Sequence, residues 1–558
     1  MSEVERPEQT AAQLEAQYDF DLGQHHCDIS SSSVEAQKWF DRGINWLYGF
    51  NHEEAVICFN KAVVADPQSV MAYWGIAFAI GPNYNKVWDM FPYQEKKTCL
   101  AIAQDAIAKG SAIKTENALA QAMLAAVAVR YPDNAEIEDY EPFNENFASE
   151  MRKVHQQYPD NLDVMAICVE SLMGRTPWAL WELETKQPAD GASTVEARDM
   201  LETAFRSQPG AWQHPGLLHL YIHLMEMSPT PELALPHGDN LSNLVPASGH
   251  LLHMATHIDV LCGDYQNVIS RNQRAALADQ PFTAMRGPGN FYTVYRIHNV
   301  HFVAYGAMFL AQKQVALDAA MELQQLLPEP VVAFMPDFFE AFWGMKLHVM
   351  VRFGMWQEIL AEEFQKDAEL FSFSTALLRY GRVIALANTG QHDAATAEYD
   401  AFLKAKEAVQ ETRYMFNNPA EDVLGIAQQM AVGERLYKSG DYEAGLDHLR
   451  AAANYSDNLH YDEPWGWMQP PRHALAALLM EQKQYVEAEE IYRADLGLND
   501  TLARPCQHPK NIWSLHGLSE CLNKRGETQE LVHVQLLLDQ ALARAEVPVS
   551  ASCYCRNT

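Results

Sequence analysis

The chain has 558 residues, 48% of them hydrophobic and 20% charged, a composition that predicts a folded protein and excludes extensive disorder. Asp and Glu number 73 against 41 Lys and Arg, and the resulting net charge of -32 disfavours nucleic acid and membrane surfaces as partners. No apolar stretch reaches the roughly 18 residues of a membrane span, and no secretory signal is evident. We therefore expect a cytoplasmic protein with reduced cysteines.

Residues 1–30 are predicted to form an extended leader. His25, His26 and Cys27 near its end are weak candidates for an extra metal ligand.

The first clear structural pattern spans residues 36–67. Its landmarks are Trp39, Gly43, Trp46, Ala55, Phe59, Ala62 and Pro67, at places 4, 8, 11, 20, 24, 27 and 32 of a 34-residue unit. Small residues at these places let two helices approach, aromatic residues fill the gap between them, and proline ends the second helix. The pattern therefore predicts a tetratricopeptide-like helix hairpin.

The same pattern recurs in weaker form along the chain. Turns at Gly263, Gly354, Gly390 and Gly440 indicate units near 249–282, 340–373, 376–409 and 426–459, and further units are expected near 70, 215, 297, 469 and 512. We predict an all-α fold, a tetratricopeptide-like α-solenoid of about nine or ten hairpins curled into a superhelix or near-closed ring. The array covers residues 31–540, and 541–558 form a flexible tail.

Two irregular stretches, 174–191 and 280–292, are predicted to be long loops, and long loops in a repeat array are often functional. Trp178 and Trp181 in the first loop, together with Trp212, are candidate residues for holding a small-molecule substrate.

Histidine is concentrated between residues 212 and 350. His219 and His223 are separated by four residues, and His253 and His257 repeat that pair 34 residues later, one unit length away. By the same register, His298, His301 and His348 also fall at groove-lining places. The repeat therefore predicts seven histidines facing one groove from four adjacent helices.

This arrangement favours metal binding over the ordinary alternative, in which a helical histidine is a structural or surface residue. Imidazoles four residues apart on a helix are close enough to share an ion, and neighbouring helices bring further imidazoles within reach. Glu226 lies on the same helix face as His223. It is a candidate metal ligand, orienting group or catalytic general base. His214 and His237 are expected in loops, and His250 near a helix cap.

The ligand type favours copper, with iron or zinc as alternatives, because imidazole suits these metals and the cluster contains no cysteine. Six imidazoles on three helices equal the ligand set of a dicopper centre. Carboxylates are too scarce for a di-iron carboxylate site.

Several strings, WFDRGINWLYGFNHEEA, YWGIAFAIGPNYN, HLYIHLMEMSP, GHLLHMATHI, HNVHF and HVMVRFGMW, resemble a broad family of tetratricopeptide-repeat proteins of bacteria and fungi. The resemblance covers roughly residues 25–530. It implies an α-solenoid and a protein-binding scaffold, and it implies no particular substrate.

Two functions follow from these patterns. The first is a metal-dependent oxidoreductase that activates dioxygen at a histidine-ligated copper or iron centre and acts on a small molecule. The alternative is a non-catalytic scaffold that binds a peptide or protein partner in the groove. Histidines at places where peptide-binding scaffolds carry Lys, Arg or Asn favour the enzyme, although a fold alone does not give a function.

Overall fold

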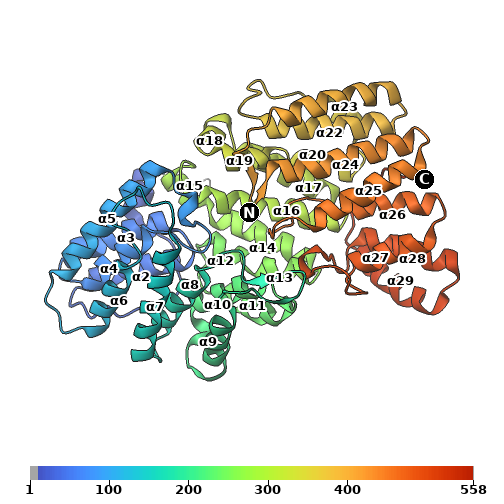
Figure 1. Cartoon of the computed structure of the whole chain (residues 1–558). Helices are drawn as coiled ribbons and strands as arrows, with labels where there is room; N and C mark the ends of the chain where they lie inside the picture. The colour runs from blue at the N-terminus through green and yellow to red at the C-terminus, as the bar shows by residue number, and fades with distance from the viewer. Residues whose placement is uncertain (1–9, 557–558) are drawn as a thin grey trace, which may run out of the picture. The chain divides into compact units, whose positions relative to one another are not determined.

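The computed structural model describes residues 10–556, and most of these residues lie in α-helices, as predicted (Figure 1). Two antiparallel pairs are the only strands among the residues described: β1 (Trp181–Glu182) with β2 (Gln187–Pro188), and β3 (Tyr414–Met415) with β4 (Asn418–Pro419). None of the helices in this range is both long and apolar enough to cross a bilayer.

The chain divides into two units. The first comprises residues 1–258 and 274–295, and the second comprises 259–273 and 296–558. The helices of the first unit are α1 (Ala11–Gln17), α2 (Val34–Tyr48), α3 (His52–Ala65), α4 (Val70–Ala79), α5 (Tyr93–Ser111), α6 (Ala118–Ala128), α7 (Glu141–Gln157), α8 (Leu162–Met173), α9 (Thr194–Ser207), α10 (Pro215–Met225), α11 (Leu235–Leu241), α12 (Gly249–His253) and α15 (Gln280–Arg286).

Three helices contain the points at which the chain passes from one unit to the other: α13 (Ala255–Leu261), α14 (Tyr265–Ala278) and α16 (Thr293–Phe309). The second unit continues with α17 (Lys313–Leu326), α18 (Glu329–Phe334), α19 (Pro336–Trp343), α20 (Met345–Arg352), α21 (Trp356–Ala361), α22 (Ser372–Asn388), α23 (His392–Glu407), α24 (Ala420–Lys438), α25 (Tyr442–Asp457), α26 (Pro471–Glu481), α27 (Tyr485–Asp495), α28 (Ile512–Arg525) and α29 (Thr528–Leu542). Short 3-10 helices lie at Trp88–Met90, Ala211–Gln213, Pro231–Ala234 and Arg504–Cys506.

The hairpin of α2 and α3 shows how the sequence builds each repeat. The side chain of Ser33 accepts a hydrogen bond from the backbone N–H of Ala36 and so caps α2, and Asn51 caps α3 in the same way. A Cβ atom at Gly43 would lie 2.5 Å from the ring of Phe59, so only glycine lets the two helices pack at this distance. The small and aromatic places of the repeat thus have the packing roles that the sequence predicts.

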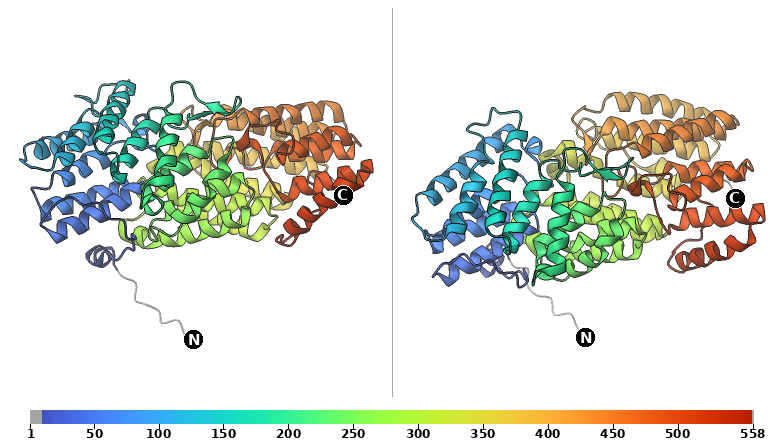
Figure 2. Two further views of the ribbon diagram at one scale, coloured as in Figure 1. Left: turned by 90° about the horizontal axis from the view of Figure 1, so that it is seen from below. Right: turned by 60° about the horizontal axis from the view of Figure 1, so that its bottom comes forward.

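Packed helix pairs lie at several of the predicted units, among them α2 with α3, α22 with α23, and α24 with α25. The glycines of the four predicted turns, at 263, 354, 390 and 440, all adopt positive φ angles, as glycine at the end of a helix commonly does. In the second unit α22 to α29 pack in sequence order, and both views of Figure 2 show these orange-to-red helices side by side.

The sequence analysis missed several elements of the first unit. The hairpin of α7 and α8 and the helix α9 carry no recognisable repeat pattern, and α15 occupies half of the loop predicted at 280–292. The predicted leader is also not free of the array in its described part. The hydroxyl of Tyr18 donates to Glu54 at 2.7 Å and accepts from the Trp46 indole at 3.0 Å.

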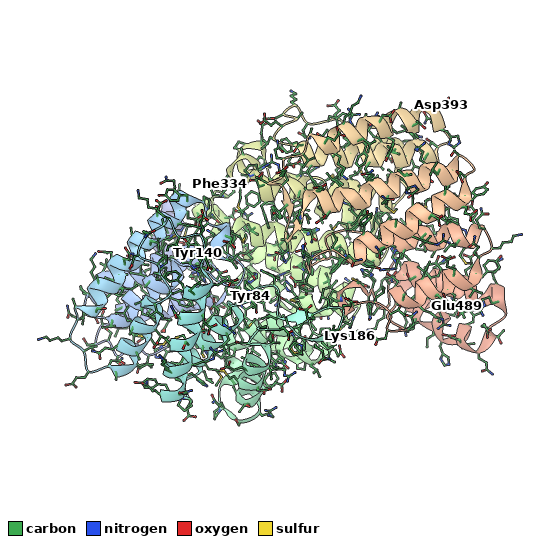
Figure 3. All side chains as sticks on the ribbon, viewed as in Figure 1. Tyr84, Tyr140, Lys186, Phe334, Asp393 and Glu489 are labelled. Carbon is green, nitrogen blue, oxygen red and sulfur yellow. A yellow bond between two sulfur atoms is a disulfide. The ribbon has the colours of Figure 1, made fainter. Side chains whose placement is uncertain are left out.

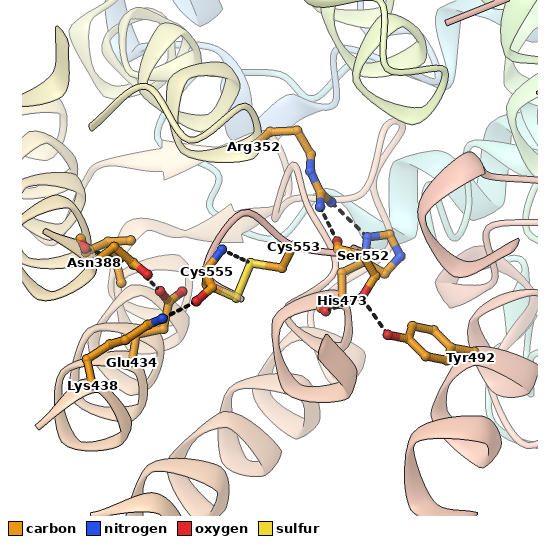
Figure 4. The surroundings of a disulfide bond; sticks show 10 residues. Arg352, Asn388, Glu434, Lys438, His473, Tyr492, Ser552, Cys553 and Cys555 are labelled. Atoms are coloured by element: carbon orange, nitrogen blue, oxygen red, sulfur yellow. Dashed lines mark hydrogen bonds between the residues drawn. A yellow bond between two sulfur atoms is a disulfide. The ribbon is translucent and has the colours of Figure 1, made fainter. Parts of the chain in front are cut away.

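The C-terminal segment, predicted to be flexible, packs against the second unit, and Cys553 and Cys555 form a disulfide where reduced thiols were expected (Figure 4). The backbone oxygen of Ser552 accepts from Arg352, and its hydroxyl pairs with that of Tyr492 at 2.6 Å. Lys438 donates to the backbone oxygen of Cys555.

A buried polar network centres on Asp495 in the same unit. Its carboxylate is fully buried and accepts four hydrogen bonds, from His473 at 2.8 Å, His508 at 2.8 Å, Asn511 at 2.9 Å and Ser514 at 2.6 Å. Arg352 donates to the other nitrogen of His473 at 2.9 Å, so the guanidinium charge offsets that of the carboxylate.

Candidate metal centre

The centre of the first unit is helix α10, which carries the first histidine pair. His214 caps the helix by accepting the N–H of Leu217 at 3.2 Å, and Pro215 occupies the first turn, where its missing N–H costs nothing. Every residue of α10 is buried. The imidazoles of His219 and His223 therefore have no access to bulk water, and their ring centroids lie 4.8 Å apart.

His250 of α12 completes a group of three. One ligand nitrogen from each of His219, His223 and His250 lies within 4.8 Å of the other two. The Nε2 atoms of His219 and His250 are 3.1 Å apart. This close set of three imidazoles is the ligand set of an open-sided zinc or copper site.

Fixed hydrogen-bond partners determine which nitrogen of two rings carries the proton. The Nδ1 of His219 lies 2.7 Å from the backbone oxygen of Tyr48, which can only accept, so Nδ1 is protonated and Nε2 presents a lone pair. The Nδ1 of His223 lies 2.9 Å from Glu226 Oε1. Its Nε2 is buried without any hydrogen-bond partner. A buried lone pair without a donor fits the place of a metal ion.

Glu226 orients two imidazoles at once. Its side chain is fully buried, and its second oxygen lies 2.6 Å from Nδ1 of His257. As a carboxylate it accepts both N–H groups, so the lone pair of each of these two rings lies on Nε2. Of the three roles predicted for Glu226, the geometry supports that of an orienting group in the second shell of a metal.

The second histidine pair meets across a break in its helix. Helix α12 ends at His253 and α13 begins at Ala255, with the N–H of His257 bonded to the oxygen of Met254 at 3.2 Å. The Nε2 atoms of His253 and His257 are 2.7 Å apart. Because Glu226 holds Nδ1 of His257 as a donor, the Nε2 lone pair of His257 faces His253.

Burial keeps the rings in the neutral form that binds metals. Desolvation lowers the pKa of His223 to about 3 and, with the neighbouring imidazoles, lowers the pKa of His219 well below its ordinary value. The imidazoles are thus uncharged at neutral pH.

Aromatic rings enclose this cluster. The Phe50 ring stacks on His223 and His250, with centroid distances of 5.8 and 5.5 Å, and lies 4.4 Å from the His219 ring. The ring of Tyr84, labelled in Figure 3, lies 5.0 Å from that of His223. These rings exclude water and fix the imidazole positions.

The seven histidines that the sequence places along one groove come from both units, and whether they share a groove stays a prediction. His219, His223, His253 and His257 belong to the first unit, whereas His298, His301 and His348 belong to the second. There His298 packs against Phe302 and Phe416, His301 Nε2 lies 2.7 Å from the sulfur of Met468, and His348 meets the edge of Trp467.

Sequence reasoning also placed His250 at a cap and outside the ligand set. It is the second residue of α12, directly after the cap at Ser248, and its imidazole nevertheless lies with those of His219 and His223. The three-residue spacing between His250 and His253 was the sequence signal that both lie on one helix face and that His250 could join the cluster.

The three tryptophans lie in different surroundings. The Trp178 ring lies 5.9 Å from that of His223, and the Trp181 indole donates to the backbone oxygen of Leu224 at 2.7 Å. Trp212 stacks on His237 at 4.5 Å. Trp178 thus contacts the histidine cluster, Trp181 contacts the backbone of α10, and Trp212 contacts His237.

A second group in the first unit, His25, Asp163 and His214, is equally close-set but unsuited to a metal. His214 Nδ1 accepts the N–H of Leu217 and so carries no proton. Its proton is on Nε2, which faces Asp163 at 3.2 Å. Metal binding through Nε2 would break the cap of α10. This group is a hydrogen-bonded tie between the leader and the array.

No protein-family model matches the sequence, and no curated protein matches it. Solved structures similar to the chain include the Cut9–Hcn1 hetero-tetramer of the APC/C, with 14% identity over 92% of this chain and 82% of that one and a TM-score of 0.31. A human IFIT1 dimer with m7Gppp-AAAA shares 11% identity over 96% and 94%, with a TM-score of 0.30. Yeast Tom70 shares 9% over 90% and 92%, with a TM-score of 0.29.

At these identities and TM-scores, the comparisons assign neither a family nor a role to this chain. The helices of the chain itself confirm the α-helical fold, built from packed helix pairs, that the sequence predicts.

The predicted oxidoreductase is corrected by the same comparison. None of the similar structures named above is described as a metal-dependent oxidoreductase, so that prediction has no support, and the scaffold that the sequence offered as the alternative remains. The small-molecule substrate predicted under the tryptophans has no support either. What the structure retains from the metal prediction is a set of histidines placed to hold an ion.

Proposed function

We propose that this chain is a helical-repeat scaffold that binds a protein or peptide partner and holds a transition-metal ion inside its first unit. The observation that carries the metal assignment is the Nε2 atom of His223, buried without a hydrogen-bond partner beside the ligand nitrogens of His219 and His250.

The role of the ion follows from the elements that it would join. His219 lies on α10 and is bonded to the end of α2 through the Tyr48 carbonyl oxygen, and His250 lies on α12. An ion held by these side chains ties three helices that are far apart in the sequence. Because the unfolded chain offers no such site, the binding free energy stabilises the folded unit.

Copper is the proposed metal, and zinc and iron are alternatives that elemental analysis distinguishes. The ligand atoms are imidazole nitrogens, and neither cysteine nor methionine lies among the three residues. His253 and His257, joined to His223 through Glu226, provide a second pair of imidazoles for the same ion or a neighbouring one.

A protein partner is proposed from the repeat fold together with the charge. The net charge of -32 attracts basic segments and repels acidic ones.

The test is elemental analysis of full-length protein purified without a histidine tag. We expect a stoichiometric transition metal that is lost in His223→Ala and His250→Ala. His237→Ala and His392→Ala serve as controls, because His237 packs on Trp212 and His392 is exposed. Metal content in the His223 and His250 variants equal to that of the parent would contradict the metal assignment.

A further inference from the structure

A second feature of the first unit is a small pocket that contains an unpaired buried carboxylate. Glu170 of α8 is only 7% exposed, and its Oε1 atom has no hydrogen-bond partner. The pocket is lined by Glu170 together with Phe78, Tyr84, Trp88, Arg130 and Phe147. Leaving a carboxylate oxygen buried without a donor costs free energy, so the fold has reason to supply one from outside.

Arg130 does not meet this need. It is itself buried, and its guanidinium donates to the backbone oxygens of Phe78 and Pro82. It lies over the rings of Phe78 and Phe147, 4.9 and 5.1 Å from their centroids. Arg130 is therefore engaged by carbonyl oxygens and aromatic faces, and the Glu170 oxygen is left to a ligand.

The walls suit a cation. Of the four aromatic rings that line the pocket, two already face Arg130, and those of Tyr84 and Trp88 can attract an ammonium group. Burial raises the pKa of Glu170 to about 7, against the opposing effect of the Arg130 guanidinium, so a bound cation would also restore the ionised carboxylate.

The size limits what can enter. The cavity volume is about 30 Å³, enough for a group the size of one or two water molecules. Its rim includes the partly exposed residues Val87, Asn144 and Gly174, so a longer ligand can extend outwards.

We propose that this pocket binds a primary ammonium group, whose N–H groups donate to Oε1 of Glu170 while the rest of the ligand leaves through the rim. A lysine side chain or the amino terminus of a peptide carries this group, and both agree with the acidic charge of the chain. The assignment of the ligand to a peptide rests on the proposed function, whereas the pocket itself does not depend on the metal.

The pocket also adjoins the metal centre. The Tyr84 side chain lines the pocket, and its ring lies 5.0 Å from that of His223. An occupant of the pocket would thus be separated from a candidate metal ligand by one aromatic ring.

The experiment uses full-length protein and three small probes, with binding followed by saturation-transfer NMR. N-acetyl-lysinamide carries only the side-chain ammonium, glycinamide carries only the α-ammonium, and N-acetyl-norleucinamide matches the first probe without the charge. We expect one or both ammonium probes to bind and the norleucine probe not to bind. The probe that binds more tightly identifies the source of the group.

Glu170→Gln should weaken ammonium binding by about tenfold or more, since it removes the charged acceptor. Glu184→Gln, at an exposed loop position, should bind like the parent. Equal binding of the norleucine and lysine probes, or equal affinity in Glu170→Gln, would overturn the proposal. The comparison of the three probes on the parent protein still tests the proposal if the Glu170→Gln variant folds poorly.

Metal content measured on the same samples separates this inference from the proposed function. If the parent contains metal but does not bind the ammonium probes, the pocket proposal alone is refuted. If the parent contains no metal but binds the ammonium probes, the metal assignment alone is refuted.

Discussion

The substitution Glu226→Gln tests how the carboxylate controls the imidazoles around it. The carboxylate accepts from Nδ1 of His223 at 2.9 Å and from Nδ1 of His257 at 2.6 Å. Glutamine has nearly the same shape, but its amide offers only one oxygen. One of the two rings must then face an N–H₂ group, move its proton from Nδ1 to Nε2, and lose the lone pair that faces the metal.

We expect metal affinity to fall by about 10- to 100-fold, the usual effect of removing an orienting partner of a metal ligand. This corresponds to roughly 1.4 to 2.8 kcal/mol. The assay is competition with a chelator of known affinity at neutral pH, with circular dichroism to confirm that the helices are retained.

Glu340→Gln is the matched control, because Glu340 is an equally buried carboxyl in the second unit, bonded to the N–H groups of Phe373 and Ser374. Affinity in Glu226→Gln within a factor of two or so of the control would refute the tautomer argument.

Three further predictions concern the scaffold. Asp495→Asn should lower the free energy of unfolding by about 3–5 kcal/mol, because it removes the charge from a buried network. Chemical denaturation measures this change. The control is Asp393→Asn at an exposed position (Figure 3), which should change the free energy of unfolding by less than about 0.5 kcal/mol. Burial alone would raise the pKa of Asp495, but His473 and His508 hold it well below its ordinary value. The stability that the Asp495 carboxylate contributes should therefore be complete above about pH 4 and be lost as the pH falls through the folded-state pKa. Denaturation midpoints that do not fall at acid pH would contradict this. His214→Asn, which preserves a helix cap, should leave metal content unchanged, and a loss of metal would show that His214 is a ligand.

Much of the fold could be predicted from the sequence because each repeat depends on a few local rules. Gly43 must be small where Phe59 packs against it, and the turn glycines 263, 354, 390 and 440 need positive φ. These requirements place glycine and aromatic residues at fixed spacing in the sequence. The hairpin of α7 and α8 satisfies the same packing with other residues, and so it left no recognisable pattern.

The candidate site could be predicted only in part. Two histidines four residues apart on a helix share a face, which brought His219 and His223 together correctly. His250 reaches that pair from a different helix, α12, and the helix that contacts α10 at this point cannot be identified from local spacing. The acceptor for His219 is a backbone oxygen, that of Tyr48, which no side-chain pattern can reveal.

The Glu170 pocket lay outside the reach of the sequence for a related reason. Glu170 comes from α8, and Arg130 follows α6, in the stretch without repeat marks. Their proximity depends on how these helices pack, and an unpaired carboxylate becomes recognisable only once the surrounding donors are placed.

The most direct test of the metal centre is an anomalous difference map from crystals of tag-free protein, collected above and below the absorption edge of the metal identified by elemental analysis. The account predicts a peak about 2 Å from the Nε2 atoms of His219, His223 and His250. Absence of a peak in a metal-loaded crystal, or a peak at His25, Asp163 and His214 instead, would contradict it.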